Sequence, residues 1–508
     1  MNVKNIYEIL QNLKKRRSVL ENILNENNIP FGNDSDATSA FRTECDELKK
    51  LKVAAVMDAF TLGNFKSECN LMQITADNWR EEMESFAPDL FFLESAWEGK
   101  DKSWYKKVAN GSKELYDLTN YCHEKGIPVI FWNKEDPVYT DTFISAASCA
   151  DFVFTTDFDC INRYKRTLQH NNVYLLHFSA QPQVHNPVEM HDRKDKFCFA
   201  GAYYHRYKDR SRVFDAFADV FEKGKGLDIY DRNLGSARPE HAFPQRYNKM
   251  IVGNLKPEDI HIAYKGYNYG INMNSVNQSQ TMFARRVYEL LASNTVSVGN
   301  YSRGTKNLFG DLTICTDSAD AMEKHLHKYC YEPEDYRKYR LLGLRKVLKD
   351  NLCEDRLGFI AKCVFNKDMR RKMPDIYVLS ANADVFSRQT YENKYIASSF
   401  EEIPDDAFVA VMNKDDYYSE NYLLDLALSV RYSDCDGFGK VCFYENINGD
   451  IICNDRDCTY KKCDRLAGAR SIIKKSAITD KNAYLSGEGE YCKVTGFLKN
   501  APSQKAGM

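Results

Sequence analysis

The chain of 508 residues has no apolar run long enough to cross a lipid bilayer, and its formal net charge is only −2. A charge so close to zero gives no overall field that would attract nucleic acid or an anionic membrane. The 16 cysteines are scattered, without the regular pairs of a disulfide framework or the C-x2-C spacing of a zinc site. The opening residues do not have the pattern of a signal peptide. We therefore expect a cytoplasmic protein with reduced cysteines, no nucleic-acid partner and no transmembrane segment.

Several common catalytic signatures are also missing. The sequence contains no P-loop, no G-x-G-x-x-G fingerprint, no H-E-x-x-H motif and no G-x-S-x-G elbow. The motifs therefore give no support for a P-loop NTPase, a dinucleotide-dependent enzyme, a zinc peptidase or an α/β-hydrolase. Aromatic residues are plentiful instead, with 32 Tyr and 29 Phe, and clefts rich in aromatic and hydroxyl groups suit sugars and nucleobases.

Apolar strands alternate with helical stretches over residues 51–185, which predicts a doubly wound, mainly parallel α/β sheet. The strands end in polar side chains, as expected where the carboxyl edge of such a sheet forms a binding cleft. The groups at these ends are Asp58, Glu94, Asp136, Asp157 and His177. A breaker-rich, charged linker over 181–195 then separates this domain from a second α/β domain at 196–365.

The two ends of the chain have different patterns. Apolar residues recur at helical spacing within residues 1–50, which predicts a helical N-terminal extension. Such a helix either packs on its own domain or offers a surface for a homodimer. Residues 374–508 contain further strand segments and indicate a smaller C-terminal α/β domain.

The most informative stretch is 272–303, where a polar loop precedes a predicted helix over 282–292 and a strand over 295–298. Apolar residues at Met282, Val287 and Leu291 give that helix one buried face. Arg286 and Glu289 lie three residues apart and therefore emerge at neighbouring helix positions. Loop, helix and strand form one αβ unit of an open sheet, and such sheets bind ligands at this edge.

This stretch resembles the C-terminal half of GT-B glycosyltransferases, most closely the CgeB-like, spore-maturation-type group. The resemblance rests on the order of Asn274, the Arg286-Val-Tyr-Glu289 helix, a small-residue step and a strand. The resemblance implies two Rossmann-like domains, with the acceptor at 51–185 and the nucleotide-sugar donor at 196–365. It also implies that Glu289 holds the ribose hydroxyls. Many relatives carry another acid eight positions upstream, where this chain has Thr281. A simpler interpretation of Glu289 stays open, as an exposed carboxylate paired with Arg285 or Arg286.

A transferase of this kind must neutralise a leaving diphosphate with cations or helix N-terminal amides. The segment 201–210 offers a glycine turn followed by basic residues, of which we favour Arg206 and Arg210 over Lys208. Further loops at Asp231-Arg232 and at Ser302-Arg303 are expected to face the same ligand. The predicted donor contacts are Gly201, Arg206, Arg210, Asp231, Arg232, Asn274, Arg286, Glu289 and Arg303.

An inverting enzyme also needs a base that reaches the acceptor hydroxyl. Candidates from the strand ends and the linker are Asp58, Glu94, Asp136 and His185. Glu94 has the best context, because Trp97 and Trp104 follow it and could stack on a sugar. A retaining enzyme requires no such base.

The C-terminal domain resembles part of a GT-A glycosyltransferase, whose acidic residues chelate a divalent metal ion at a position that matches the run from Asn413 to Tyr418. The strands that would bind the nucleotide are not evident. We therefore predict an accessory domain, in which Asp415 and Asp416 form a polar turn and hold no metal.

The resemblance implies a bacterial hexosyltransferase-like enzyme that uses a UDP-sugar, and the basic loop leads us to expect no metal or other cofactor. Its acceptor would be a polysaccharide, a cell-envelope polymer or a protein. Two alternatives stay open: a GT-B shell that lost catalysis and acts as a scaffold, and a nonhydrolysing sugar-nucleotide epimerase.

Overall fold

The computed structural model describes residues 41–236, 242–379, 383–440, 442–454, 460–486 and 490–500. The predicted helical extension lies mostly in residues 1–40, outside this range, so the helix and its role in a homodimer stay predictions. In residues 41–50 the only helical element is the short turn η1 (Leu48–Lys50).

The first domain is built on a six-stranded sheet in which every strand pair is parallel, in the order β2-β1-β3-β4-β5-β6. Strands β3 and β4 are buried at every position, because a parallel sheet covered by helices on both faces needs continuous apolar runs. The strands are β1 (Lys52–Val56), β2 (Asn70–Gln73), β3 (Leu90–Glu94), β4 (Val129–Asn133), β5 (Phe152–Thr155) and β6 (Val173–Leu175). The helices are α2 (Ala59–Phe65), α3 (Trp79–Phe86), α4 (Lys107–Asn110), α5 (Lys113–Glu124), α6 (Ile144–Ala147) and α7 (Cys160–Leu168).

The second domain repeats the plan with a six-stranded parallel sheet in the order β12-β11-β10-β7-β8-β9. Its strands are β7 (Lys194–Gly201), β8 (Leu227–Asp231), β9 (Ile251–Gly253), β10 (Tyr267–Asn272), β11 (Val296–Gly299) and β12 (Ile314–Cys315). Its helices are α8 (Lys208–Lys223), α9 (Ile260–Lys265), α10 (Arg286–Ala292), α11 (Arg303–Phe309), α12 (Ala319–Cys330) and α13 (Pro333–Asp350). Two successive parallel α/β domains confirm the predicted fold class.

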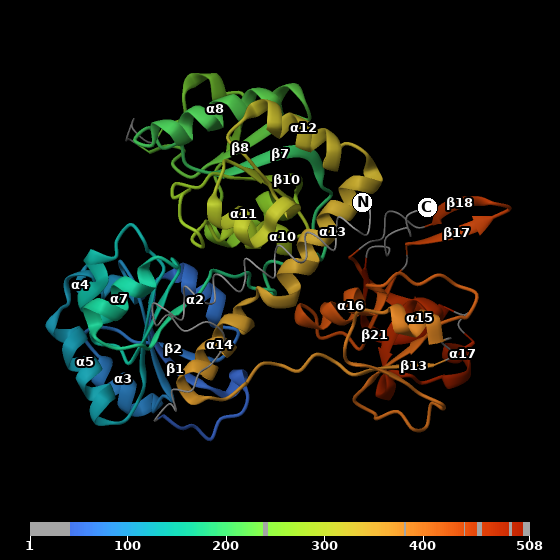
Figure 1. Ribbon diagram of the computed structural model, residues 1–508, viewed down its shortest axis with the longest axis horizontal. Helices are drawn as coiled ribbons and strands as arrows, with labels where there is room; N and C mark the ends of the chain where they lie inside the picture. The colour runs from blue at the N-terminus through green and yellow to red at the C-terminus, as the bar shows by residue number, and fades with distance from the viewer. Residues whose placement is uncertain are drawn as a thin grey trace, which may run out of the picture.

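The chain then crosses back to the first domain, as Figure 1 shows for α14 (Cys353–Phe365) below the end of α13. Leu357, Ile360 and Val364 of α14 share one hydrophobic core with Val53 and Phe92 of the first sheet. This return ties the two domains together through a second connection besides the linker.

The third domain contains a mixed sheet in the order β14-β13-β15-β20-β16-β21-β19, and a separate hairpin. The sheet strands are β13 (Ile376–Leu379), β14 (Lys394–Ile396), β15 (Phe408–Val411), β16 (Gly437–Lys440), β19 (Lys462–Ala467), β20 (Ser471–Lys474) and β21 (Glu490–Asn500). The hairpin is β17 (Phe443–Ile447) with β18 (Asp450–Asn454), and the helices are α15 (Ala383–Arg388), α16 (Tyr422–Ala427) and α17 (Lys481–Leu485).

This domain is docked on the second domain rather than loosely attached. One hydrophobic core contains Val287 of α10, Leu344 and Leu348 of α13, Ile376 of β13 and Leu423 of α16. Because these apolar side chains are buried together, removing the third domain would expose part of α13 to water. Figure 1 shows α13 reaching from the second domain to this junction.

Candidate functional site

Helix α10 places Glu289 inside the second domain. The helix begins at Arg286, four residues later than predicted, because the Met282 and Ala284 amides bond to the side chains of Ser279 and Asn274 instead. Glu289 is only 4% exposed. Its Oε2 accepts a hydrogen bond from the Tyr264 hydroxyl at 3.0 Å, and its Oε1 lies 3.0 Å from Nε of Arg285. The expected pair with Arg285 is therefore present, but the carboxylate is buried and not the exposed group of the simpler interpretation.

Burial raises the pKa of Glu289, but the charge of Arg285 and the hydrogen bond from Tyr264 outweigh it and hold that pKa below its usual range. The group is thus an anion at neutral pH. Nε2 of His185, from the linker between the domains, lies 4.0 Å from Oε1 of Glu289. Burial lowers the pKa of His185, so the imidazole is neutral, and its buried Nδ1 has no hydrogen-bond partner among the described residues.

Three arginines gather at the carboxyl edge of the second sheet: Arg210 in the first turn of α8, Arg232 after β8 and Arg286 at the start of α10. We name them the arginine cluster. Arg210 donates to the Met273 carbonyl at 3.3 Å, and Arg286 donates to the Tyr264 hydroxyl at 3.3 Å. Burial lowers the pKa of Arg210 to about 10, and the charges of Arg286 and Arg232 add to this effect. Among the described residues, no carboxylate lies within ion-pair distance of any of the three.

Three of the remaining predicted donor residues have a role in the local backbone. Gly201 ends β7, and a Cβ there would meet the ring of Phe199 at 2.8 Å, which leaves no room for a side chain. Asp231 accepts a bond from the Asn233 amide at 2.9 Å, and this forms a turn rather than a helix cap. Asn274 accepts a bond from the Ala284 amide at 3.0 Å and shapes the loop before α10.

Two predicted basic residues lie apart from the arginine cluster. Arg206 is exposed and stacks over the ring of Tyr207 at 4.7 Å, so the structure does not bring it to the other arginines. Arg303 was expected in a loop, but it is the first residue of α11, which Ser302 caps by accepting a bond from the Thr305 amide. Its guanidinium bonds to Gln280 at 3.4 Å, on the outer side of the preceding loop.

The loop before α10 is hydrogen-bonded to the first domain, and no motif in the sequence signalled this contact. The Thr281 hydroxyl donates to the Thr156 carbonyl and accepts from the Phe158 amide, both at 2.9 Å. The Ser279 hydroxyl bonds to the carboxylate of Asp157, next to the end of β5. The position that carries an acid in the resembled family is thus used here to join the two domains. We name these contacts the Thr281 latch.

Two strand-end acids of the first sheet, Asp58 and Glu94, are neutralised within the domain. Nζ of Lys134 lies 2.9 Å from Oδ2 of Asp58 and 3.0 Å from Oε1 of Glu94. Asp58 also accepts three backbone bonds at 3.0 Å, from residues 97–99. Glu94 is fully buried and accepts further bonds from the Asp58 amide and the Thr61 hydroxyl. Both acids hold loops in place, and a role for either as the base stays a prediction.

The aromatic residues after Glu94 are also structural. Trp104 is fully buried and donates from Nε1 to the Ile74 carbonyl at 2.8 Å, so it is not placed to stack on a sugar. The Trp97 ring packs edge-on against Tyr139 and Phe143.

Asp136 lies inside the same domain. It accepts bonds from Asn133 at 2.9 Å and from Thr140 at 2.7 Å, and burial raises its pKa to about 6. Of the four candidate bases, the structure brings only His185 beside Glu289.

In the third domain the predicted polar turn forms: Oδ2 of Asp416 accepts from the Asn413 amide group at 3.1 Å. Asp415 and Asp416 are exposed. Within the described part of the chain, no three His, Cys, Asp or Glu side chains are arranged to hold a metal ion. Among these same residues, no helix combines the length and apolar character needed to span a bilayer.

The arginine cluster and Glu289 lie in or next to a recognisable segment. Residues 212–362 match the family model described as glycosyl transferase-like. The matched range includes Arg232, Arg286 and Glu289 and begins two residues after Arg210. No curated protein sequence is significantly similar to the chain.

Solved glycosyltransferase structures are distantly similar to the chain. A glycosyltransferase from Rickettsia africae ESF-5 has 11% identity and a TM-score of 0.41 over 62% of this chain and 90% of that one. Sucrose-phosphate synthase from Thermosynechococcus elongatus has 12% identity and a TM-score of 0.39 over 56% and 75%. A UDP-forming trehalose-phosphate synthase from Burkholderia xenovorans has 10% identity and a TM-score of 0.37 over 57% and 77%. Likenesses this distant do not bear on the activity.

Proposed function

We propose that the chain is a glycosyltransferase that takes a sugar from a nucleoside-diphosphate sugar bound at the carboxyl edge of the second sheet. The observation that carries the proposal is the arginine cluster, in which three cations lie together without a carboxylate partner among the described residues. The charges of Arg286 and Arg232 help to lower the pKa of Arg210, and a bound diphosphate would reverse this cost. The match of residues 212–362 to a glycosyl transferase-like family supports the same activity.

Each residue has a distinct role in this proposal. Glu289, an anion held by Arg285 and Tyr264, accepts hydrogen bonds from the ribose hydroxyls. The arginine cluster binds the diphosphate and stabilises the negative charge that grows on it as the bond to the sugar breaks. The neutral His185 places Nε2 4.0 Å from Oε1 of Glu289 and is proposed to support that carboxylate beside the donor.

The finer assignments are that UDP is the nucleotide and that the acceptor is a polysaccharide, envelope polymer or protein chain. We further propose that transfer needs no divalent metal, because the arginine cluster supplies the positive charge that a metal ion would otherwise bring to the diphosphate. Transfer that stops in EDTA and returns with manganese would contradict this point. It would direct attention to Asp415 and Asp416.

Calorimetry with UDP, GDP and CDP on the full chain tests the proposal. The Arg210→Ala variant should weaken the preferred diphosphate at least tenfold, because a charge-assisted hydrogen bond is lost. Arg212→Ala is the matched control: its side chain is 80% exposed on the same helix and pairs with Asp209. Equal affinity of both variants, with both folded, would place the ligand elsewhere. A folded wild-type chain that binds none of the three nucleotides would favour the scaffold alternative.

A further inference from the structure

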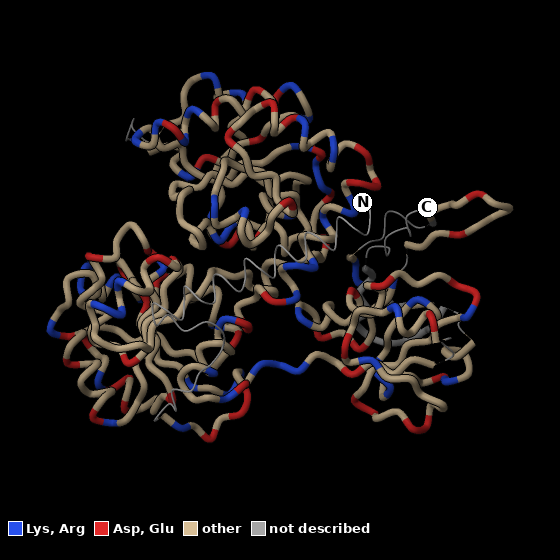
Figure 2. The backbone as a smooth tube through the Cα atoms, viewed as in Figure 1, with Lys and Arg blue, Asp and Glu red and all other residues tan. Residues whose placement is uncertain are grey.

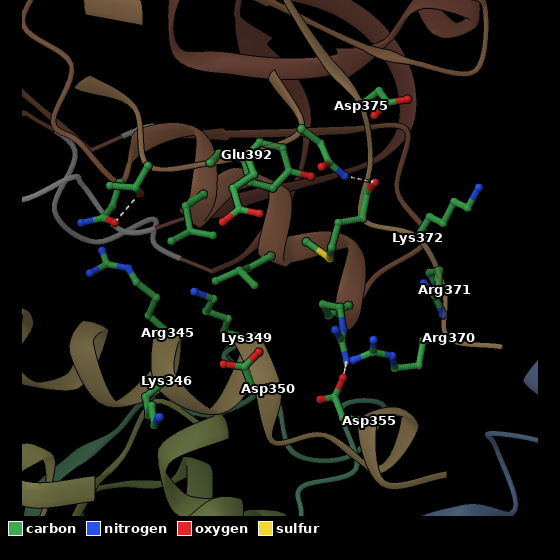
Figure 3. Close-up of a pocket in the computed structure, with 18 of the residues that line it drawn as sticks. Arg345, Lys346, Lys349, Asp350, Asp355, Arg370, Arg371, Lys372, Asp375 and Glu392 are labelled. Atoms are coloured by element: carbon green, nitrogen blue, oxygen red, sulfur yellow. Dashed lines mark hydrogen bonds and ion pairs between the residues drawn. The ribbon is translucent and has the colours of Figure 1, made fainter. Parts of the chain in front are cut away.

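A second cavity of about 850 Å³ lies where the third domain meets α13, and none of its lining residues belongs to the arginine cluster. Figure 3 shows its walls. Arg345, Lys346, Lys349 and Asp350 come from α13, and residues 370–372 come from the extended linker. Glu392 comes from the third domain. A cavity of this volume accommodates an organic ligand of several rings, and is far larger than a single inorganic anion.

The arginines nearest the domain junction are already used to hold the domains together. Arg345 forms a two-pronged bond to Asp425 at 2.8 and 3.2 Å, and Lys440 lies 3.0 Å from the same carboxylate. Arg431 lies 2.7 Å from Asp355. These buried pairs fix the shape of the cavity but do not offer their charges to a ligand.

Unlike these arginines, three lysines of the lining are not paired with a carboxylate of the described residues. Lys346, Lys349 and Lys372 have no ion-pair partner among the described residues. Arg371 donates to the Val430 carbonyl at 2.8 Å, and its ion pair, at 3.9 Å to the 99% exposed Asp434, contributes little. Seven basic and five acidic side chains line the cavity in all, so its net charge is positive. Figure 2 shows the basic run of the linker between the first and third domains.

The other lining groups suit hydroxyl-rich molecules. Asp350 and Glu392 line the cavity without an ion-pair partner among the described residues. Asn393 donates to the Met373 carbonyl and adds its amide oxygen, whereas the Asn421 amide is already bonded to Thr390 and Glu420. Carboxylates and amides accept hydrogen bonds from hydroxyls, whereas lysines bind anionic substituents. Leucine, methionine and tyrosine side chains cover the apolar part of the lining.

We propose that this junction cavity binds an anionic glycan segment, and that the segment belongs to the acceptor of the transfer reaction. The second part of this inference rests on the proposed function. Helix α13 lines the cavity and packs in one hydrophobic core with α10, which carries Arg286 and Glu289. The cavity and the donor site therefore share one rigid support. An acceptor chain held in the cavity would be presented to the donor site at high effective concentration.

The test is calorimetry of the full chain with a sulfated tetrasaccharide, neutral maltotetraose and inorganic polyphosphate as probes. In the Lys346→Glu, Lys349→Glu double variant the affinity for the sulfated tetrasaccharide should fall at least tenfold. The matched control is Lys324→Glu with Lys338→Glu. Both of its lysines are exposed outside the cavity, and the net charge changes equally. The control should lose less than twofold. Added salt should weaken the wild-type interaction, since it depends on charge.

Three results would overturn the inference: equal losses in both double variants, no tetrasaccharide binding by the wild type, or polyphosphate binding as tightly as the tetrasaccharide. Lys346→Gln with Lys349→Gln provides a milder second variant should the glutamates disturb folding. UDP affinity is measured on every variant and should not change. Loss of tetrasaccharide binding with intact UDP binding concerns only this cavity, whereas a wild type that binds no nucleotide contradicts only the proposed function.

Discussion

Both parallel sheets have charged residues at their carboxyl edge, but the charges are paired in the first sheet and, among the described residues, not in the second. At the carboxyl edge of the first sheet, Asp58 and Glu94 are closed into an ion triad by Lys134. At the carboxyl edge of the second sheet, Arg210, Arg232 and Arg286 gather without a carboxylate partner among the described residues. Asp58 and Glu94 are thus paired inside the protein, whereas the only carboxylate of the described residues that acts on the cluster, Glu289 on Arg286, lies beyond ion-pair distance and is itself paired with Arg285.

This difference shows that a charged residue after a strand is not by itself evidence of a binding site. The decisive property is whether its charge is compensated inside the protein, since buried charges are costly unless they are paired. This criterion supports the proposal that the ligand binds at the second sheet. The comparison predicts that charge removal destabilises the first edge but weakens ligand binding at the second.

The largest effect is expected for Lys134→Met in the first edge. Removing this cation leaves the carboxylates of Asp58 and Glu94 close together without their shared partner. Breaking a buried pair in this way costs about 3–5 kcal/mol of folding free energy. Differential scanning calorimetry should show a lower melting temperature for the first domain. UDP affinity of the folded variant should be unchanged, and a variant as stable as the wild type would contradict the structural role.

The second effect concerns Asp136, whose pKa burial raises to about 6 from its ordinary 3.8. The folded state holds this proton more tightly than the unfolded state. Its contribution therefore favours folding at low pH and is lost as the pH rises from about 4 to about 6. In Asp136→Asn this loss should disappear. Melting temperatures of the wild type and the variant across pH 4–7 provide the measurement, and parallel curves would rule out the raised pKa.

The third effect tests the second edge through Glu289→Ala. Loss of charge-assisted hydrogen bonds to the ribose should cost roughly 1.5–3 kcal/mol of UDP binding free energy, measured by calorimetry. Glu289→Gln is the control, because it keeps an acceptor for the Tyr264 hydroxyl but removes the charge. Unchanged affinity in a folded Glu289→Ala variant would remove Glu289 from the site.

The sequence predicted the two parallel domains well, because buried parallel strands leave continuous apolar runs such as those of β3 and β4. It missed β2, an edge strand whose residues are only partly buried. Among the proposed site residues, the order of loop, helix and strand pointed to Arg286 and Glu289, and the basic run after a glycine turn pointed to Arg210; their roles stay predictions. The partners of Glu94 could not, because Lys134 and Thr61 are distant in sequence and meet it only through strand packing.

The smallest effect is expected for Thr281→Val, which removes the latch between the two edges. Valine has nearly the shape of threonine, but it cannot donate to the Thr156 carbonyl or accept from the Phe158 amide. Each net hydrogen bond contributes about 0.5–1.5 kcal/mol, and the Ser279 contact to Asp157 remains. We therefore expect faster hydrogen exchange at residues 156–158 and less than a threefold change in UDP affinity. The arginine cluster does not depend on this loop for its charge, so binding at the second edge should persist when the link to the first is weakened. A variant with wild-type exchange at these amides would show that Thr281 does not hold the domains together, whereas complete loss of UDP binding would show that the first domain is needed to build the second edge.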